Sequence, residues 1–299
     1  MGPTGVGKSA VAIELARSLN GEIISADSMQ IYCGFDIGTD KVKPDGMSGV
    51  RHHLIDLVDD CCQFNASKFL SAAYRVTGEI EGRGKQVIVC GGTALYLRTM
   101  IQGIFPEQKS SRISRDRLHR LMDEKGLEYL WDRLNKVDPQ YAEKIGKNDR
   151  IRVIRALEIY YNNRMAPSEV FKLNVTPFSG YRFCRIGLDL DREILYQRIN
   201  RRVEKMIAAG LMDEVAQLMN QYPLSCPPFK SVGYREIVMV LQNKLELADA
   251  ILLIKQRSRN FAKRQLSWFR QEKDITWFKP DEIDKIEKFC SIHLADLAE

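Results

Sequence analysis

The sequence predicts an α/β protein whose core is a doubly wound parallel sheet with a phosphate-binding loop (P-loop), interrupted by a helical insertion domain. Three observations predict this class. A glycine-rich loop opens the chain, strand and helix patterns alternate over about the first hundred residues, and strand signals return near residue 183 after a charged helical stretch. We therefore expect core segments at 1–110 and 181–299, the second with C-terminal helices, and an insertion at 111–180.

The opening loop, Gly2-Pro3-Thr4-Gly5-Val6-Gly7-Lys8-Ser9, fits the pattern of glycine, four residues and Gly-Lys-Ser/Thr. Its glycines let backbone N–H groups curl around a diphosphate or triphosphate, and Lys8 adds a mobile cation. The Ser9 hydroxyl can bind a Mg²⁺ that bridges the phosphates. Small and apolar residues from Ala10 predict a helix whose N-terminus faces the anion. Such a loop normally follows a buried strand, whereas here only Met1 precedes it.

The elements after the loop follow the α/β alternation. Asn65 is typical of a helix N-cap, and Gly91-Gly92-Thr93 closes an apolar strand. We expect strands at 22–26, 52–57 and 86–90, and helices at 66–83 and from residue 94.

Residues 110–180 change to charged helical patterns, with an expected apolar stripe of Ile151, Ile154, Leu157 and Tyr161. A strand at 183–188 then marks the return of the core. The remaining pattern predicts helices at 191–209, 212–221, 234–241 and 246–272.

Charge and composition restrict the partners. The net charge of +6 is concentrated in four basic clusters at 112–120, 150–155, 198–205 and 255–273, which favours a polyanion larger than a nucleotide. Solvated helix faces are the alternative interpretation. No apolar run reaches the ~20 residues that a membrane span needs, and no signal-peptide pattern is present. Seven cysteines, an odd number without a CxxC pair, predict free thiols in a reducing cytoplasm.

Three side chains outside the loop are candidates for chemistry. Asp27 ends the second predicted element of the core, where a carboxylate can bind Mg²⁺, act as a general base or cap a turn. Thr93 supplies a hydroxyl donor after two glycines that permit close substrate approach. Arg202 falls within an apolar helix arc, so it needs either a buried carboxylate or a diphosphate oxygen as partner. His52 and His53 lack neighbours at metal-ligand spacing.

Taken together, seven motifs are specific. They are the opening loop, Ile-Ser-Ala-Asp-Ser-Met-Gln-Ile-Tyr, Asp-Ile-Gly-Thr, Gly-Gly-Thr-Ala-Leu-Tyr, Arg-Ala-Leu-Glu, Val-Gly-Tyr-Arg and Ala-Lys-Arg-Gln, in that order. The chain resembles the tRNA isopentenyltransferase (dimethylallyltransferase) family over nearly its whole length. The resemblance implies transfer of a dimethylallyl group from dimethylallyl diphosphate to the exocyclic amine of the adenine 3′-adjacent to the anticodon. The absence of a C-terminal zinc-finger set implies the bacterial type.

The resemblance also implies roles for individual residues. The loop residues Gly2, Pro3, Thr4, Gly5, Val6, Gly7, Lys8 and Ser9 would bind the prenyl diphosphate rather than ATP. Asp27 matches the general base, while Thr93 and Arg202 match contacts to the diphosphate and the substrate channel. The positions that match tRNA contacts are Asp27, Ser28, Met29, Gln30, Thr93, Arg115, Ile151, Arg152, Val153, Ile154, Arg155, Lys230, Ser231, Val232, Gly233, Tyr234 and Arg235.

We therefore expect a cytoplasmic, monomeric enzyme that uses Mg²⁺ and binds the anticodon stem-loop of tRNA. Two other functions remain compatible with the loop. One is a small-molecule kinase or adenylate prenyltransferase, which would not need dispersed basic clusters. The other is a non-catalytic RNA-binding ATPase, which would hydrolyse ATP in response to RNA.

Overall fold

The computed structural model describes residues 1–105 and 112–295. The chain forms two compact units, one made of Met1–Arg98 with Tyr181–Glu299 and the other of Thr99–Gly180. We call them unit 1 and unit 2 and describe each by itself. The expected domain boundary between residues 110 and 111 lies outside the described residues.

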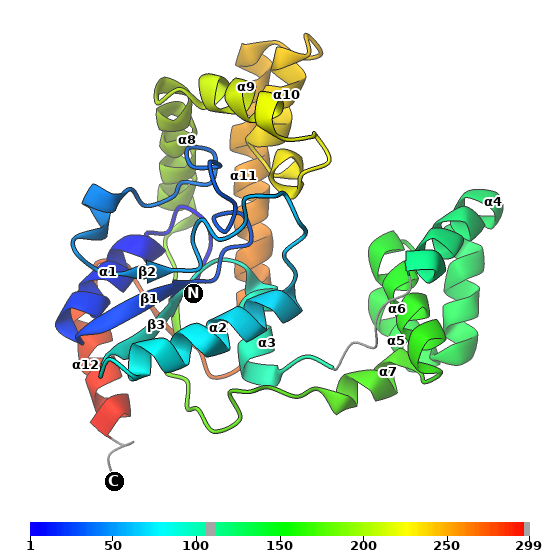
Figure 1. Cartoon of the computed structure of the whole chain (residues 1–299), viewed down its shortest axis with the longest axis horizontal. Coiled ribbons are helices and arrows are strands. Elements are labelled where there is room, and N and C mark those ends of the chain that lie inside the picture. Colours follow the sequence, from blue (N-terminus) through cyan, green and yellow to red (C-terminus); the bar gives the residue numbers. More distant parts are fainter. Residues whose placement is uncertain (106–111, 296–299) are drawn as a thin grey trace. The chain divides into compact units, whose positions relative to one another are not determined.

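Unit 1 contains a three-stranded parallel sheet of β1 (Gly21–Ser25), β2 (His52–His53) and β3 (Gln86–Cys90), in the order β2-β1-β3 (Figure 1). All five residues of the central strand β1 are buried, as expected for a strand covered on both faces. The predicted strands at 22–26 and 86–90 are confirmed. The predicted strand at 52–57 is shorter, because Leu54 and Asp56 take positive φ values of 60° and 51°.

A second, two-stranded parallel sheet pairs β4 (Ile186–Leu188) with β5 (Thr276–Phe278), with Gly187 opposite Trp277. The α/β class is thus confirmed, and the described residues form two small parallel sheets. They place no strand between β3 and β4, so the two sheets stay separate.

The helices of unit 1 cover these sheets. Asn65 caps α2 as predicted, since its side chain accepts the N–H of Lys68 at 2.9 Å. Helix α1 packs on β1 and β3, and α12 packs on α1. The helices are α1 (Lys8–Ser18), α2 (Ala66–Glu81), α3 (Ala94–Gln102, which crosses into unit 2), α8 (Arg192–Ala208), α9 (Leu211–Gln221), α10 (Tyr234–Leu241), α11 (Leu247–Phe269) and α12 (Ile283–Ala295), with short 3₁₀ turns at Pro44–Met47 and Pro227–Lys230.

Unit 2 is helical in its described residues. Its elements are α4 (Arg112–Val137), α5 (Pro139–Ile145), α6 (Arg150–Asn163), α7 (Pro167–Val170) and a 3₁₀ turn at Phe171–Leu173. Buried apolar side chains of α4, α5 and α6 form one core. The predicted stripe on α6 is wrong at one end, because Ile151 is 80 % exposed while Val153, Ile154 and Leu157 are buried.

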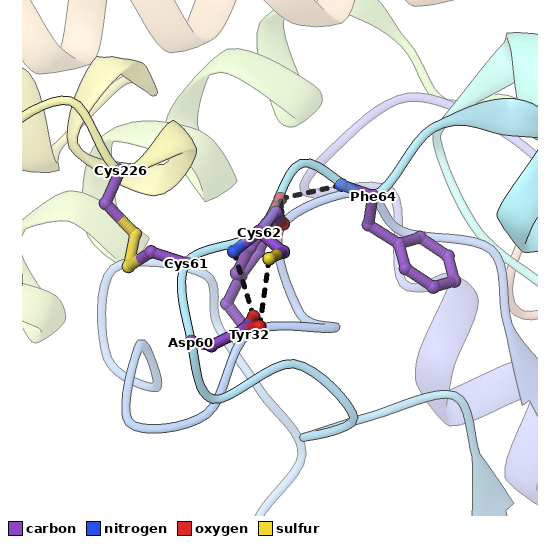
Figure 2. The surroundings of a disulfide bond; sticks show 6 residues. All are labelled: Tyr32, Asp60, Cys61, Cys62, Phe64 and Cys226. Carbon is purple, nitrogen blue, oxygen red and sulfur yellow. Dashed lines mark hydrogen bonds between the residues drawn. A yellow bond between two sulfur atoms is a disulfide. The ribbon is translucent and has the colours of Figure 1, made fainter. Parts of the chain in front are cut away.

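A disulfide joins Cys61 to Cys226 in unit 1, with Cα atoms 5.1 Å apart (Figure 2). The expectation that all cysteines are free thiols is therefore wrong for this pair. The two residues lie 165 positions apart in the chain, so no local spacing could indicate their contact. Beside the bond, the backbone N–H of Phe64 donates to the Tyr32 hydroxyl, which donates to the carbonyl of Cys62.

Among the described residues, every helix is either too short or too polar to reach across a bilayer.

Candidate active site

Two glycines of the opening loop are required by the backbone conformation and by the space around them. Gly5 and Gly7 have φ values of 82° and 104°, in the left-handed region that favours glycine. A Cβ on Gly5 would also lie 2.8 Å from Cγ1 of Ile199 on α8. Gly7 is the N-cap of α1 and leaves the first N–H groups of that helix without a side-chain cap. The loop therefore presents backbone donors and a positive helix end at one place.

This place is a cavity of about 280 Å³ formed by unit 1 alone. The loop, the turn after β1, residues 39–42 and one face of α8 surround it. Of the predicted site residues, it is lined by Thr4, Gly5, Gly7, Lys8, Ser9, Asp27, Gln30 and Arg202. The structure thus brings together two parts of the predicted site, the anion-binding loop and the acid after β1.

Three cations surround the cavity. Nζ of Lys8 donates to the Pro3 carbonyl at 2.8 Å, and burial lowers the pKa of this lysine from its ordinary value. Arg198 donates to the Val6 carbonyl at 3.4 Å. Arg202 donates to Asp40 at 3.2 Å, but its Nε is buried and has no partner in the described part of the chain. A bound anion would satisfy that Nε and favour the charged form of Lys8.

Asp27 lies two residues beyond β1 and faces this cavity. Its Oδ1 accepts the backbone N–H groups of Met29 and Gln30 at 2.9 and 3.4 Å, so the carboxylate is held by its own turn. Within the described residues its Oδ2 has no hydrogen-bond donor. The sequence left open whether Asp27 caps a turn or takes part in chemistry. Its two oxygens allow both, because Oδ1 caps the turn and Oδ2 remains available for chemistry.

Thr93 does not line the cavity. Its hydroxyl accepts the backbone N–H of Ser28 at 3.0 Å and lies 3.3 Å from the Ser28 hydroxyl. Its own N–H donates to the Ala26 carbonyl at 3.1 Å. Thr93 thus ties the strand-end turn that carries Asp27 to the chain after β3.

Thr39, Asp40 and Arg198 also line the cavity and were not among the predicted site residues. The Asp-Ile-Gly-Thr motif ends at Thr39, so it indicated this residue only as part of a pattern and did not include Asp40. Arg198 lies four positions before Arg202 on α8, a spacing that places both on one helix face.

Oxygen ligands for a hard cation are available at the same cavity. Ser9, Asp27 and Asp40 all line it, and hydroxyl and carboxylate oxygens suit Mg²⁺ when it also binds phosphate. Among the residues that the structure describes, no group of three His, Cys, Asp or Glu side chains forms a dedicated metal site.

The segment from Lys230 to Arg235 is built around a buried carboxylate. Glu236 is fully buried, accepts the N–H of Gly233 at 2.7 Å and pairs with both Arg235 and Arg257. Lys230 and Arg235 are exposed. The buried hydroxyl of Tyr234 instead donates to Glu214 at 2.6 Å, so this side chain supports the segment from inside.

Unit 2 has the same kind of arrangement on α6. Glu158 is fully buried and accepts bonds from Arg115 and Arg155, each at 2.9 Å. Arg152 pairs with Asp149, and Ile151 is exposed, whereas Val153 and Ile154 lie in the core of the unit. The structure therefore places Arg115, Ile151, Arg152 and Arg155 at or near the surface, and removes two predicted contact residues from it.

Comparison with known proteins identifies relatives of this chain. The family model described as IPP transferase matches residues 30–272. A tRNA dimethylallyltransferase of Carboxydothermus hydrogenoformans is 44 % identical over 93 % of this chain and 90 % of its own length. A tRNA dimethylallyltransferase of Oceanobacillus iheyensis is 39 % identical over 100 % of this chain and 96 % of its own length.

Solved structures give the same result. The tRNA isopentenylpyrophosphate transferase of Bacillus halodurans superposes with a TM-score of 0.73 and 38 % identity, covering 99 % of this chain and 95 % of its own. A eukaryotic dimethylallyltransferase acting on tRNA superposes with a TM-score of 0.76 and 30 % identity. The match covers 98 % of this chain and 76 % of the eukaryotic chain. With its glycine loop, its strand-end acid and these relatives, the chain belongs to the IPP transferase family.

Proposed function

We propose that the protein transfers a dimethylallyl group from dimethylallyl diphosphate to the exocyclic amine of the adenine 3′-adjacent to the anticodon in tRNA. The observation that carries this proposal is the shared cavity, in which Lys8 and Arg202 face the same space as Asp27. The relatives that are tRNA dimethylallyltransferases support the choice of substrates.

The cationic side of the cavity suits the diphosphate. In the reaction the bond between the prenyl carbon and the diphosphate oxygen breaks, and its electron pair leaves with the diphosphate. Lys8, Arg202 through its buried Nε, and the N–H groups at the start of α1 stabilise that charge. A Mg²⁺ held by Ser9 and the phosphates would add charge neutralisation.

The acidic side suits the acceptor. A neutral adenine amine is a weak nucleophile, so loss of its proton as the carbon–nitrogen bond forms lowers the barrier. Asp27 accepts that proton on Oδ2, while the bonds from Met29 and Gln30 keep Oδ1 fixed. The adenine must leave its stack to enter the cavity, at a cost of a few kcal/mol.

We propose the remaining architecture on the same basis. Unit 1 is a P-loop core with a doubly wound plan, and unit 2 is a helical insertion that contacts tRNA. The contact set is the one that the family resemblance implies. Its exposed members include Lys230 and Arg235 in unit 1 and Arg115, Ile151 and Arg152 in unit 2. We further propose a cytoplasmic monomer.

The experiment is mass spectrometry of unmodified tRNA after incubation with the protein, dimethylallyl diphosphate and Mg²⁺. We expect one dimethylallyl addition, which nuclease digestion locates at the adenine after the anticodon. The acceptor decides between functions, so an anticodon stem-loop and AMP are compared in parallel. Preference for AMP would replace the tRNA proposal with an adenylate prenyltransferase, and RNA-stimulated ATP hydrolysis without transfer would replace it with an ATPase.

A further inference from the structure

The carboxylate of Glu214 on α9 holds one loop, residues 36–40, by its backbone. Oε2 accepts the N–H groups of Asp36 and Ile37 at 3.2 and 2.7 Å, and Oε1 accepts that of Gly38 at 3.3 Å. Three successive N–H groups thus converge on a side chain that lies 176 to 178 positions away in the chain. Such a concave set of N–H groups binds a negative charge, so the carboxylate and the loop fix each other.

A fourth hydrogen bond to Glu214 comes from the hydroxyl of Tyr234 on α10, which lies 2.6 Å from Oε1. The Tyr234 side chain is fully buried, and burial and the neighbouring carboxylate raise its pKa, so the hydroxyl stays protonated and remains a donor. The tyrosine ring also packs on the loop, because a Cβ on Gly38 would lie 2.4 Å from its Cε2. Side chains of both α9 and α10 therefore hold the 36–40 loop.

The same loop reaches the substrate cavity at its other end. The Thr39 hydroxyl donates to the carbonyl of Phe35 at 2.6 Å, and the N–H of Asp40 donates to that of Ile37 at 3.1 Å. Thr39 and Asp40 both line the cavity. Because these bonds close the loop into one turn, a shift where it starts also moves the residues that face the cavity.

Asp40 connects this loop to a cation of the cavity. Its Oδ2 accepts Nη1 of Arg202 at 3.2 Å, and the side-chain amide of Gln30 donates to the carbonyls of Thr39 and Asp40 at 3.1 and 3.2 Å. Arg202 also carries the buried Nε that a bound diphosphate would satisfy. The guanidinium is therefore oriented by Asp40, and Asp40 is oriented by the loop that Glu214 holds.

We propose that Glu214 is a positioning residue for the diphosphate. It holds the 36–40 loop so that Asp40 presents Arg202 to the prenyl diphosphate. It acts from outside the cavity, since it is not one of the described residues that line it. The inference rests on the proposed transfer reaction and adds to it the support on which one of its cations depends.

The first test is Glu214→Gln in the full chain. The amide keeps one oxygen but turns an NH₂ group towards the N–H donors of the loop, so the loop loses part of its support. We expect the KM for dimethylallyl diphosphate to rise about tenfold, with a change in kcat below about threefold. Binding of magnesium pyrophosphate, measured by calorimetry without tRNA, should weaken by the same factor as the KM rises.

Two variants separate this role from a general effect on the fold. Asp213→Asn removes a charge from the preceding residue of α9, which is exposed and makes no hydrogen bond to the 36–40 loop in the described part of the chain. It should leave the KM at the parental value. Glu214→Asp keeps the carboxylate on a shorter side chain, so its pyrophosphate affinity should lie between those of the parent and Glu214→Gln.

A double substitution shows whether Glu214 acts through Asp40. Asp40→Asn alone weakens the pair with Arg202 and should raise the same KM. If Asp40 transmits the effect, combining Asp40→Asn with Glu214→Gln should raise the KM no further than the larger single change does.

The proposal is wrong if Glu214→Gln lowers the Tm but leaves the KM and pyrophosphate binding at their parental values. Effects of the two substitutions that multiply in the double variant would also overturn it. If Glu214→Gln does not fold, Glu214→Asp decides, and parental pyrophosphate binding by that variant refutes the proposal. Failure of the transfer reaction is a separate result, in which the parent forms no dimethylallyl-tRNA while the pyrophosphate titrations still decide the role of Glu214.

Discussion

The two ends of β1 each carry a carboxylate, and their surroundings are opposite. Glu22, in the amino-terminal part of the strand, is 2 % exposed. Its carboxylate oxygens lie 2.6 Å from His53, 2.7 Å from Arg83 and 3.6 Å from Lys85. Asp27, beyond the carboxyl end, faces the 280 Å³ cavity and, among the residues that the structure describes, accepts hydrogen bonds only from N–H groups of its own turn. A carboxylate with hydrogen-bond partners on both oxygens stabilises the fold. A carboxylate that keeps one oxygen without a donor at a strand's carboxyl end is available for chemistry.

The sharpest test of this contrast is Asp27→Asn. The amide keeps an Oδ1 for the N–H groups of Met29 and Gln30 but cannot accept the adenine proton. We expect single-turnover transfer to fall by about 10³-fold, with an unchanged Tm and unchanged tRNA binding. A rate within a few-fold of the parent would show that Asp27 is not the base.

The matched change at the other end is Glu22→Gln, which should affect only the fold. It leaves Arg83 and His53 beside a neutral amide in a buried place, at a cost of about 3 kcal/mol in the free energy of unfolding. Urea titration measures this loss. Transfer per folded molecule should stay at the parental rate, and a selective loss of transfer would refute the division of roles between the two carboxylates.

The cationic side of the cavity gives a third test. Lys8→Met keeps the length of the side chain and removes its charge, so we expect the KM for dimethylallyl diphosphate to rise roughly 10- to 100-fold. Lys43→Met is the control, because Lys43 is exposed and does not line the cavity. Equal effects of the two changes would indicate a general loss of positive charge rather than a specific contact.

The sequence predicted the parts of the site that depend on short patterns. Lys8, Ser9 and Asp27 lie in a loop or at a strand end, where local spacing determines both structure and chemistry. Arg198 and Asp40 were missed because their place at the cavity depends on how α8 and the loop after β1 pack in the fold. The disulfide between Cys61 and Cys226 was missed for the same reason, since 165 residues separate them.

The surroundings of Glu22 could not be predicted either, because its partners come from β2 and from the turn after α2. Helix periodicity likewise failed at Ile151, since it does not show where the buried arc of α6 begins.

The smallest expected effect is the pH dependence of the stabilisation by Glu22. Hydrogen bonds from Arg83 and His53 lower the pKa of Glu22 from 4.5 to about 2 in the folded protein. A lowered folded pKa means that the stabilisation is complete above the unfolded value and is lost as the pH falls towards 2. At pH 4 the difference in unfolding free energy between the parent and Glu22→Gln should therefore be about 1 kcal/mol smaller than at pH 7. Urea titrations of both proteins at these two pH values measure it. A difference that stays constant would mean that Glu22 titrates normally in the fold, and that the contrast between the two ends of β1 is one of position rather than of charge.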